Sequence, residues 1–193
     1  MLKQIPYLIA MDMIQPGDFI QVKGTGDISK LIMKFTKYSH SMTIIKYPES
    51  LLPHYPNNRL QIVESTIKDH INGLTSSHYI DRLRYDYSNG AEWYWIKTKL
   101  NNEQRIRSME FLIIELAKEI PYDIYTLFRN ILGYVPFGTG SYICSELVFA
   151  MMIACGAYNG NTQYAPRPGD LDIWLEDIIE DIFYLIGPKD NVC

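Results

Sequence analysis

The chain has 193 residues, of which 47 % are hydrophobic and 21 % charged, and this composition suits one globular domain with a sizeable core. The formal net charge is −4 and no basic cluster stands out, which argues against nucleic-acid binding. No window approaches ~18 uncharged apolar residues, so no transmembrane helix is expected. The apolar run near the N-terminus lacks a clear small-residue cleavage site, so no signal peptide is predicted, and a reducing, cytoplasmic setting fits best.

The first part of the chain alternates between short apolar segments and turns. Pro16-Gly17-Asp18 is typical of a turn that leads into a strand, and Asp27 is a candidate cap for an amphipathic helix. The elements expected here are a turn and strand (15–24), a helix (27–38), a strand (39–47), a loop with three prolines (47–58), a strand (59–66) and a mainly irregular polar stretch (67–90).

The second part of the chain is richer in helical patterns. Asn101 or Asn102 can cap the first of them, and Pro121 is expected to stop it. The elements expected here are a strand (91–100), two helices (101–120 and 122–132), a glycine-rich loop (133–141), a helix running roughly to residue 154, a loop (164–170) and a final helix or strand (173–186).

The cysteine content bounds the chemistry. The three cysteines, Cys144, Cys155 and Cys193, form no CxxC pair, so neither a structural zinc site nor a disulfide framework is expected. A metal hydrolase is disfavoured because no HExxH motif or paired His/Asp cluster occurs. We therefore expect no metal and no cofactor.

Cys144 lies where a helix is expected to begin, after a loop in which Ser141 or a neighbour supplies the cap. Free backbone N–H groups and the helix dipole favour a thiolate in a first turn, and a nearby N–H can steady an oxyanion. Gly138 and Gly140 allow the loop backbone to approach a substrate closely. Cys155 falls on an apolar stripe late in the same helix and is predicted to be a core thiol. A buried, unreactive Cys144 remains the alternative, and Cys193 is expected to be frayed and inert.

A reactive cysteine needs a base, and His40 is the best candidate. The other three histidines, His54, His70 and His78, lie in the proline loop or the polar stretch and are predicted to be surface residues. His40 begins a strand, on the face shared with Met42 and Ile44. Glu64 lies in the next strand inside an apolar run, where burial of a carboxylate is costly unless it is paired. Pairing with His40 would remove that cost and fix the imidazole tautomer.

The sequence resembles the permuted branch of the NlpC-type papain-like superfamily, the YiiX/YaeF-like cysteine amidases and peptidases, with lecithin:retinol acyltransferase-like proteins as more distant relatives. The resemblance spans about residues 14–157. It rests on "IQPGDFIQVK", "YSHSMTII", "QIVEST", "IPYD" and "SYICSELVFAMMIACG", which occur in the expected order. The order His, Glu, Cys matches the circularly permuted members. The resemblance implies one α+β domain over residues 1–193, with a small antiparallel sheet or partial barrel packed against helices.

The same resemblance implies Cys144 as nucleophile, His40 as base and Glu64 as the residue that orients His40. The expected activity is thiol hydrolysis of an amide bond through an acyl-enzyme, on a peptide, a cell-wall peptide or an N-acyl amine. Two alternatives stay open: a lipid acyltransferase or thioesterase with the same chemistry, and a non-catalytic binding module that keeps the fold.

Overall fold

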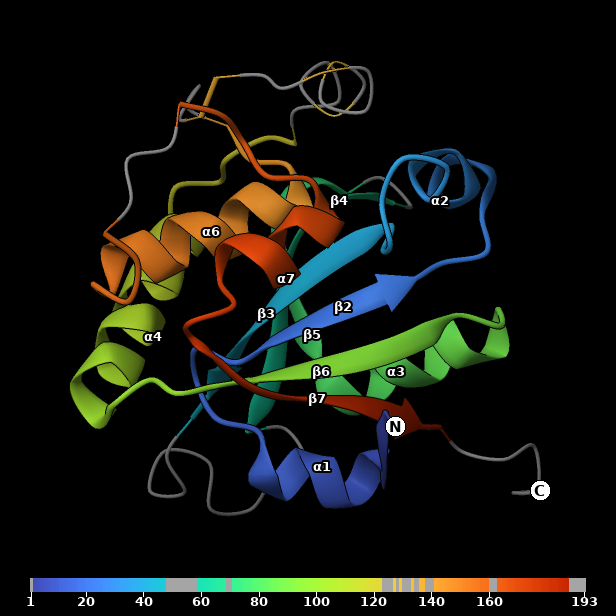
Figure 1. Ribbon diagram of the computed structural model, residues 1–193, viewed down its shortest axis with the longest axis horizontal. Helices are drawn as coiled ribbons and strands as arrows, with labels where there is room; N and C mark the ends of the chain where they lie inside the picture. The colour runs from blue at the N-terminus through green and yellow to red at the C-terminus, as the bar shows by residue number, and fades with distance from the viewer. Residues whose placement is uncertain are drawn as a thin grey trace.

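The computed structural model is built around a mixed β-sheet, shown in Figure 1. The structure describes residues 2–47, 59–68, 71–122, 127, 129, 133, 136–137, 141–159 and 163–187. Among these, the strands are β1 (Lys3–Pro6), β2 (Phe19–Lys23), β3 (His40–Lys46), β4 (Leu60–Lys68), β5 (Ile71–His78), β6 (Glu92–Thr98) and β7 (Ile179–Ile186). The helices are α1 (Tyr7–Met13), α2 (Asp27–Ile32), α3 (Tyr79–Ser88), α4 (Asn102–Leu116), α6 (Cys144–Ala154) and α7 (Leu171–Trp174), with a 3₁₀ turn at Pro168–Asp170.

The strands follow the order β1-β7-β6-β2-β3-β4-β5 across the sheet. β1 and β7 run parallel, and every other neighbouring pair is antiparallel. The prediction of a small, purely antiparallel sheet or partial barrel is therefore corrected to a seven-stranded mixed sheet within the described residues. The additional strands β1 and β5 come from segments that were not expected to pair, and the final segment of uncertain type supplies β7.

Helices cover both faces of the sheet (Figure 1). On one face α1 and α3 pack on a core that includes Tyr79, Leu83 and Trp93. On the other face α4, α6 and α7 pack on a second core that includes Leu112 and Phe149. Because side chains alternate along a strand, each central strand contributes to both cores. The fold is thus a helix–sheet–helix sandwich of the α+β class.

Strand alternation places His40 and Glu64 on one face. His40 shares its face with Met42 and Ile44, and Glu64 shares its face with Ile62. Met42, Ile44 and Ile62 all belong to the core under α1 and α3. His40 is the first residue of β3, so its ring lies at the end of the strand, where it interacts with Cys144 at the start of α6.

Several predicted elements are confirmed, and two need correction. The strands expected near 41–46, 60–65 and 92–98 and the helix ending at Ala154 are present, and Asn101 caps α4 through a capping box with Gln104. The segment 67–90 is not mainly loop, because it forms the end of β4, all of β5 and all of α3. The helix expected over 27–38 ends at Ile32, since Tyr38 is drawn into the core and the chain must turn back toward β3.

Two smaller boundaries also differ from the expected ones. Asp27 is the first residue of α2 and Gly26 is its N-cap, so Asp27 does not cap the helix. Helix α4 ends at Leu116, before Pro121, and the chain leaves it through Glu119 with a positive φ of 52°. The loop predicted at 47–58, the helix at 122–132 and the glycine-rich loop at 133–141 lie almost wholly outside the described residues. No helix among the described residues has the length and apolarity needed to span a bilayer.

Candidate active site

Cys144 is the first residue of α6, as the sequence predicts for a first-turn cysteine. Of the predicted cap positions, Ser141 or a neighbouring loop residue, the structure uses the neighbour Ile143, which makes no side-chain capping bond. The thiol is buried, with 1 % of the residue exposed. Its sulfur accepts hydrogen bonds from the backbone N–H groups of Ser41 and Ser145. Main-chain donors at the start of a helix favour the thiolate form of a cysteine.

The imidazole of His40 lies between Cys144 and Glu64. Its Nε2 is 2.6 Å from Glu64 Oε2, and its other nitrogen is left for the hydrogen bond that the ring shares with Cys144. The three predicted site residues are thus brought together from β3, β4 and α6. Helix α6 packs over β3, partly through a 2.9 Å contact from Thr43 Oγ1 to Met151 Sδ, and this packing holds the thiol against the strand end.

Glu64 is a buried carboxylate, with 4 % of its side chain exposed, and Arg82 is its second partner. Arg82 Nε donates to Oε1 at 2.6 Å, and Arg82 Nη2 donates to Oε2 at 3.1 Å. Both carboxylate oxygens are therefore held, and Oε2 is shared between the imidazole and the guanidinium. This pairing offsets the desolvation free energy of burying the Glu64 charge inside an apolar strand.

A second carboxylate lies behind Arg82. Arg82 Nη1 donates to Asp86 Oδ1, one helical turn further along α3. The indole Nε1 of Trp93 donates to the other oxygen of Asp86 at 2.9 Å. The sequence interpretation missed Arg82 and Asp86 because it treated 67–90 as irregular. The available signal was the i, i+4 spacing of Arg82 and Asp86 beside the apolar Tyr79 and Leu83.

The charges of these groups reinforce one another. Burial raises the pKa of Glu64, but hydrogen bonds and charges from His40 and Arg82 outweigh it and lower the value to about 2. Burial lowers the pKa of His40, but its interactions with Cys144 and Glu64 raise it above its ordinary range. Burial raises the pKa of the Cys144 thiol, but the His40 imidazolium and the two backbone N–H groups lower it overall. The arrangement therefore favours a thiolate–imidazolium pair.

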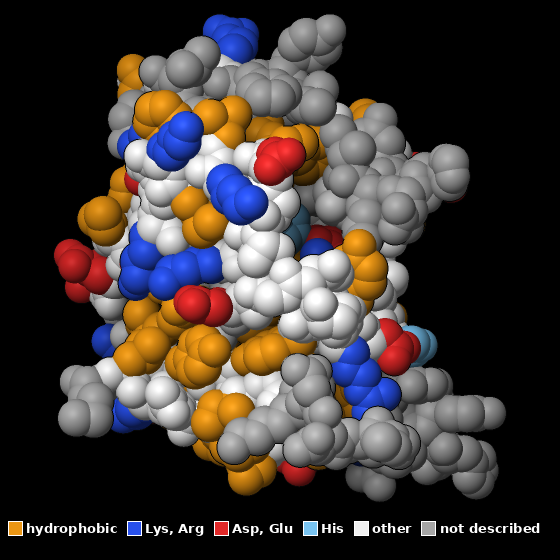
Figure 2. All heavy atoms as spheres, turned by 90° about the vertical axis from the view of Figure 1, so that its right-hand side faces the viewer, with side chains coloured by type: hydrophobic (Ala, Val, Ile, Leu, Met, Phe, Trp, Pro, Cys, Tyr) orange, Lys and Arg blue, Asp and Glu red, His pale blue; other side chains and the backbone are white. Residues whose placement is uncertain are grey.

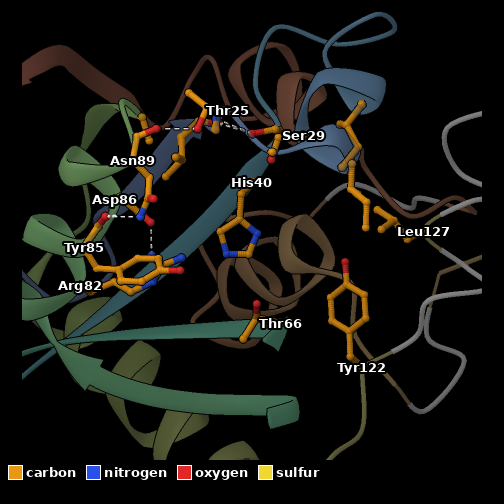
Figure 3. Close-up of a pocket in the computed structure, with 17 residues that line it drawn as sticks. Thr25, Ser29, His40, Thr66, Arg82, Tyr85, Asp86, Asn89, Tyr122 and Leu127 are labelled. Carbon is orange, nitrogen blue, oxygen red and sulfur yellow. Dashed lines mark hydrogen bonds and ion pairs between the residues drawn. The ribbon is translucent and has the colours of Figure 1, made fainter. Parts of the chain in front are cut away.

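A pocket of about 480 Å³ opens beside His40. In Figure 2 a histidine, an acidic and a basic side chain are visible at the bottom of a hollow on this face. In Figure 3 the His40 ring points into the centre of the pocket, between the α3 side chains Arg82 and Asp86 and the opposite wall with Tyr122 and Leu127. Its volume is in the range of ligand pockets. His40 lines the pocket, whereas Cys144 does not. The pocket therefore borders the imidazole directly, and the imidazole connects it to the thiol.

The remaining cysteines and histidines lie away from this site or outside the described residues. Cys155 is the C-cap of α6 and is fully buried, and its Sγ contacts Met152 O at 3.4 Å. Burial raises the pKa of this thiol. His78, which was predicted to be exposed, is half-buried and its Nδ1 lies 3.1 Å from Gln61 Nε2. The predictions for His54, His70 and Cys193 fall outside the described residues.

No protein-family model and no curated protein sequence matches the chain. Solved structures do match. One is the metalloprotein yiiX from Escherichia coli O157:H7, a DUF1105 protein, which superposes with a TM-score of 0.52 at 18 % sequence identity, over 74 % of this chain and 67 % of its own. The likeness shows that this chain shares the fold of yiiX, in agreement with the resemblance seen in the sequence.

The name of yiiX describes it as a metalloprotein. Within the part of this chain that the structure describes, no group of three or more His, Cys, Asp or Glu side chains is arranged to hold a metal ion. The carboxylate and imidazole of the site are instead engaged with each other, with Arg82 and with the Cys144 thiol. These residues do not fit a metal site.

Proposed function

We propose that the protein is a cysteine hydrolase that cleaves an amide bond, with Cys144 as nucleophile, His40 as acid and base, and Glu64 as the residue that orients His40. One observation carries the proposal. The carboxylate is hydrogen-bonded to the imidazole, and the imidazole interacts with the thiol, beside a pocket large enough for a substrate group. A nucleophile, a base and a group that orients the base are the recurring parts of acyl-transfer sites.

The proposed reaction gives each of these three groups one role. The Cys144 thiolate attacks the carbonyl carbon, and the carbonyl oxygen takes up the negative charge of the tetrahedral intermediate. The C–N bond then breaks as His40 gives its proton to the leaving amine, which yields a thioester. Neutral His40 next takes a proton from water, and the resulting hydroxide attacks the thioester. The carboxylic acid leaves and the thiolate–imidazolium pair is restored.

We assign the pocket beside His40 to the leaving group of the substrate. His40 lines the pocket whereas Cys144 does not, and the leaving amine must sit next to the imidazole that protonates it. The backbone N–H groups of Ser41 and Ser145, which contact the sulfur, lie close to where the oxyanion would form. A reduced thiol is required throughout, which is consistent with the reducing, cytoplasmic setting that the sequence predicts.

A second candidate is acyl transfer or thioester cleavage on a lipid, and exposed apolar side chains of α2 and the residues that follow it favour this candidate. Ile28 and Phe35 remain 52 % and 48 % exposed, although both belong to the predicted apolar face of this helix segment. Ile28 lines the pocket, while Phe35 borders an adjoining crevice with Ile32 and Leu127. An aliphatic chain would cover this surface, and the chemistry at Cys144 would be unchanged.

The test is the capture of the acyl-enzyme. The purified protein is incubated with short peptides, N-acyl amines and acyl thioesters, quenched in acid, and its intact mass is measured. We expect a mass increase equal to the acyl group, with release of amine, and its absence in Cys144→Ala. Cys155→Ala is the matched control and should behave as the wild type. Glu64→Gln should keep KM but lower kcat by ~10²–10⁴-fold, the range of general acid–base assistance.

Each outcome separates the candidates. Acylation by amides supports the amidase, and acylation only by thioesters or lipid esters supports the second candidate. If neither class acylates Cys144, the site is a binding module and the hydrolase proposal is wrong.

A further inference from the structure

The row of site residues creates an electrostatic conflict. A thiolate at Cys144 and an ionised Glu64 lie on opposite sides of one His40 imidazolium. Two anions beside a single cation repel each other, and each disfavours the ionisation of the other. The carboxylate of Asp86 adds a third anion, on the far side of Arg82. A further cation is therefore needed if the thiolate is to persist.

Arg82 is that cation, and its contacts match the need in both charge and shape. One edge of the guanidinium spans the two oxygens of Glu64, while Nη1 reaches Asp86. A planar fork of this kind fixes a carboxylate in orientation, which the point charge of a lysine does not. Because Arg82 holds both oxygens, Oε2 is kept toward Nε2 of His40 at 2.6 Å.

The guanidinium is itself fixed from behind. Asp86 is anchored by the Trp93 indole on β6, so α3 and the sheet together hold Arg82 in place. Among the described residues, the charged groups that face Glu64 are His40 from β3 and Arg82, backed by Asp86, from α3. On the thiol side, α6 carries the buried Glu146 in the same first turn as Cys144. Acidic groups thus outnumber basic groups around the pair formed by Cys144 and His40. Arg82 is the cationic side chain that contacts Glu64 from α3.

We propose that Arg82 is a positioning residue that neutralises and orients Glu64, so that His40 and Cys144 remain an ionised pair. This inference rests on the proposed function, because it assigns Arg82 to the same reaction. Arg82 acts through Glu64 and does not touch the reacting atoms. Without it, the pair of Glu64 and His40 would persist, but the thiolate would be reprotonated.

The experiment measures the pH dependence of Cys144 alkylation by iodoacetamide, with the site of labelling read by peptide mass. Arg82→Met removes the charge and the fork, and Arg82→Lys keeps the charge alone. Arg84→Met is the matched control, because Arg84 is exposed on the same helix. Thermal melts of every variant accompany the labelling, and kcat and KM are measured on one accepted substrate.

We expect Arg82→Met to raise the pH at which Cys144 alkylation reaches half its maximal rate by about one pH unit. At any fixed pH below that midpoint, the variant would then hold about tenfold less thiolate than the wild type. Arg82→Lys should restore most of that shift but leave kcat low at unchanged KM, because a lysine cannot hold both oxygens. Arg84→Met should match the wild type. A purely structural role for Arg82 would lower the melting temperature without moving the midpoint.

The inference is overturned if Arg82→Met moves the midpoint no further than Arg84→Met, or if Arg82→Lys turns over as fast as the wild type. If Arg82→Met does not fold, the kcat of Arg82→Lys decides. A wild-type Cys144 that alkylates like an ordinary thiol would instead overturn the proposed function, before any Arg82 variant is compared.

Discussion

The two described cysteines show how position along one helix sets thiol chemistry. Cys144 opens α6 and receives two backbone N–H groups and a histidine, whereas Cys155 follows its last turn among apolar side chains. Both are buried, so exposure does not distinguish them. The distinguishing factor is the charge that each environment stabilises, because helix N-termini favour anions and C-termini disfavour them. The pKa is lowered for the first thiol and raised for the second.

From this contrast we predict that Cys144 is alkylated much faster than Cys155 by iodoacetamide at neutral pH, because the thiolate is the reacting species. The measurement is a short labelling pulse followed by peptide mapping. His40→Ala should slow the labelling of Cys144 and leave that of Cys155 unchanged, since His40 supplies the cation for one thiol only. Equal rates at the two cysteines in the wild type would mean that Cys144 is not activated.

From the lowered pKa of Glu64 we predict that the folded protein loses stability in acid. Its pKa is about 2 in the folded protein against an ordinary 4.5, so its contribution is fully present above pH 4.5 and is lost as the pH falls toward 2. At pH 3 the loss amounts to about 2 kcal/mol, from 1.36 kcal/mol per pKa unit. Urea unfolding of the wild type and Glu64→Gln at pH 6 and pH 3 measures it. The stability difference between them should shrink by that amount, and a constant difference would contradict the ion pairs drawn around Glu64.

At the scale of elements, the sequence predicted the central strands well and α3 poorly. Strands β3 and β4 carry continuous apolar alternation, so their pairing and the shared face of His40 and Glu64 could be inferred. In α3 the buried face is formed by Tyr79 and Leu83 together with the carboxylate of Asp86, amid many polar residues. A search for periodic hydrophobic residues does not detect a buried helix face that consists partly of ion pairs and tyrosines. The residues that brace Glu64 were missed for that reason.

The start of α6 was predictable for a related reason, and its cap was not. An apolar run from Leu147 to Ala154 follows Cys144, Ser145 and Glu146, so a helix beginning near Cys144 was favoured. Nine of the eleven residues of α6 are buried. A cap by Ser141 or a neighbouring residue follows from side-chain preference, but here Ile143 is the N-cap and the first-turn N–H group of Ser145 interacts with the thiol. Preference rules for capping do not anticipate a donor that is kept for chemistry.

Leu83 tests whether α3 is a structural part of the site. Its side chain is fully buried between the helix and the sheet, so Leu83→Ala should destabilise the protein by about 2–5 kcal/mol, the range for such cavities. Urea unfolding gives the value, and Arg84→Ala on the exposed face of α3 is the control, expected within about 0.5 kcal/mol. A change below about 1 kcal/mol at Leu83 would mean that α3 is not docked as described.

For the molecule as a whole, the ionised pair has a consequence for the free energy of unfolding. The pKa of His40 is raised from 6.5 to about 10 in the folded protein. Between these pH values, the folded state keeps a proton on His40 that the unfolded state has released. That contribution is complete below pH 6.5 and is lost as the pH rises toward 10. The lowered pKa of Cys144 has the opposite effect, because the folded state has released a proton that the unfolded thiol keeps up to pH 9.0. Between these limits the two proton counts cancel.

We therefore predict a different pH slope of stability for wild type and Cys144→Ala between pH 7 and pH 8.5. The pair makes no net contribution to the slope in the wild type. In Cys144→Ala the thiol, the largest cause that raises the pKa of His40, is gone, and Glu64 alone acts against burial to keep the proton on His40. Over the pH range in which His40 keeps that proton, the unfolding free energy should fall relative to the wild type by up to about 1.4 kcal/mol per pH unit. Urea unfolding at several pH values measures the difference. Cys155→Ala is the control, because that thiol is neutral in both states over this range and its curve should run parallel to the wild type. Parallel curves for Cys144→Ala as well would show that the folded variant holds no additional proton on His40, and the prediction that Glu64 alone keeps this imidazole protonated would be wrong.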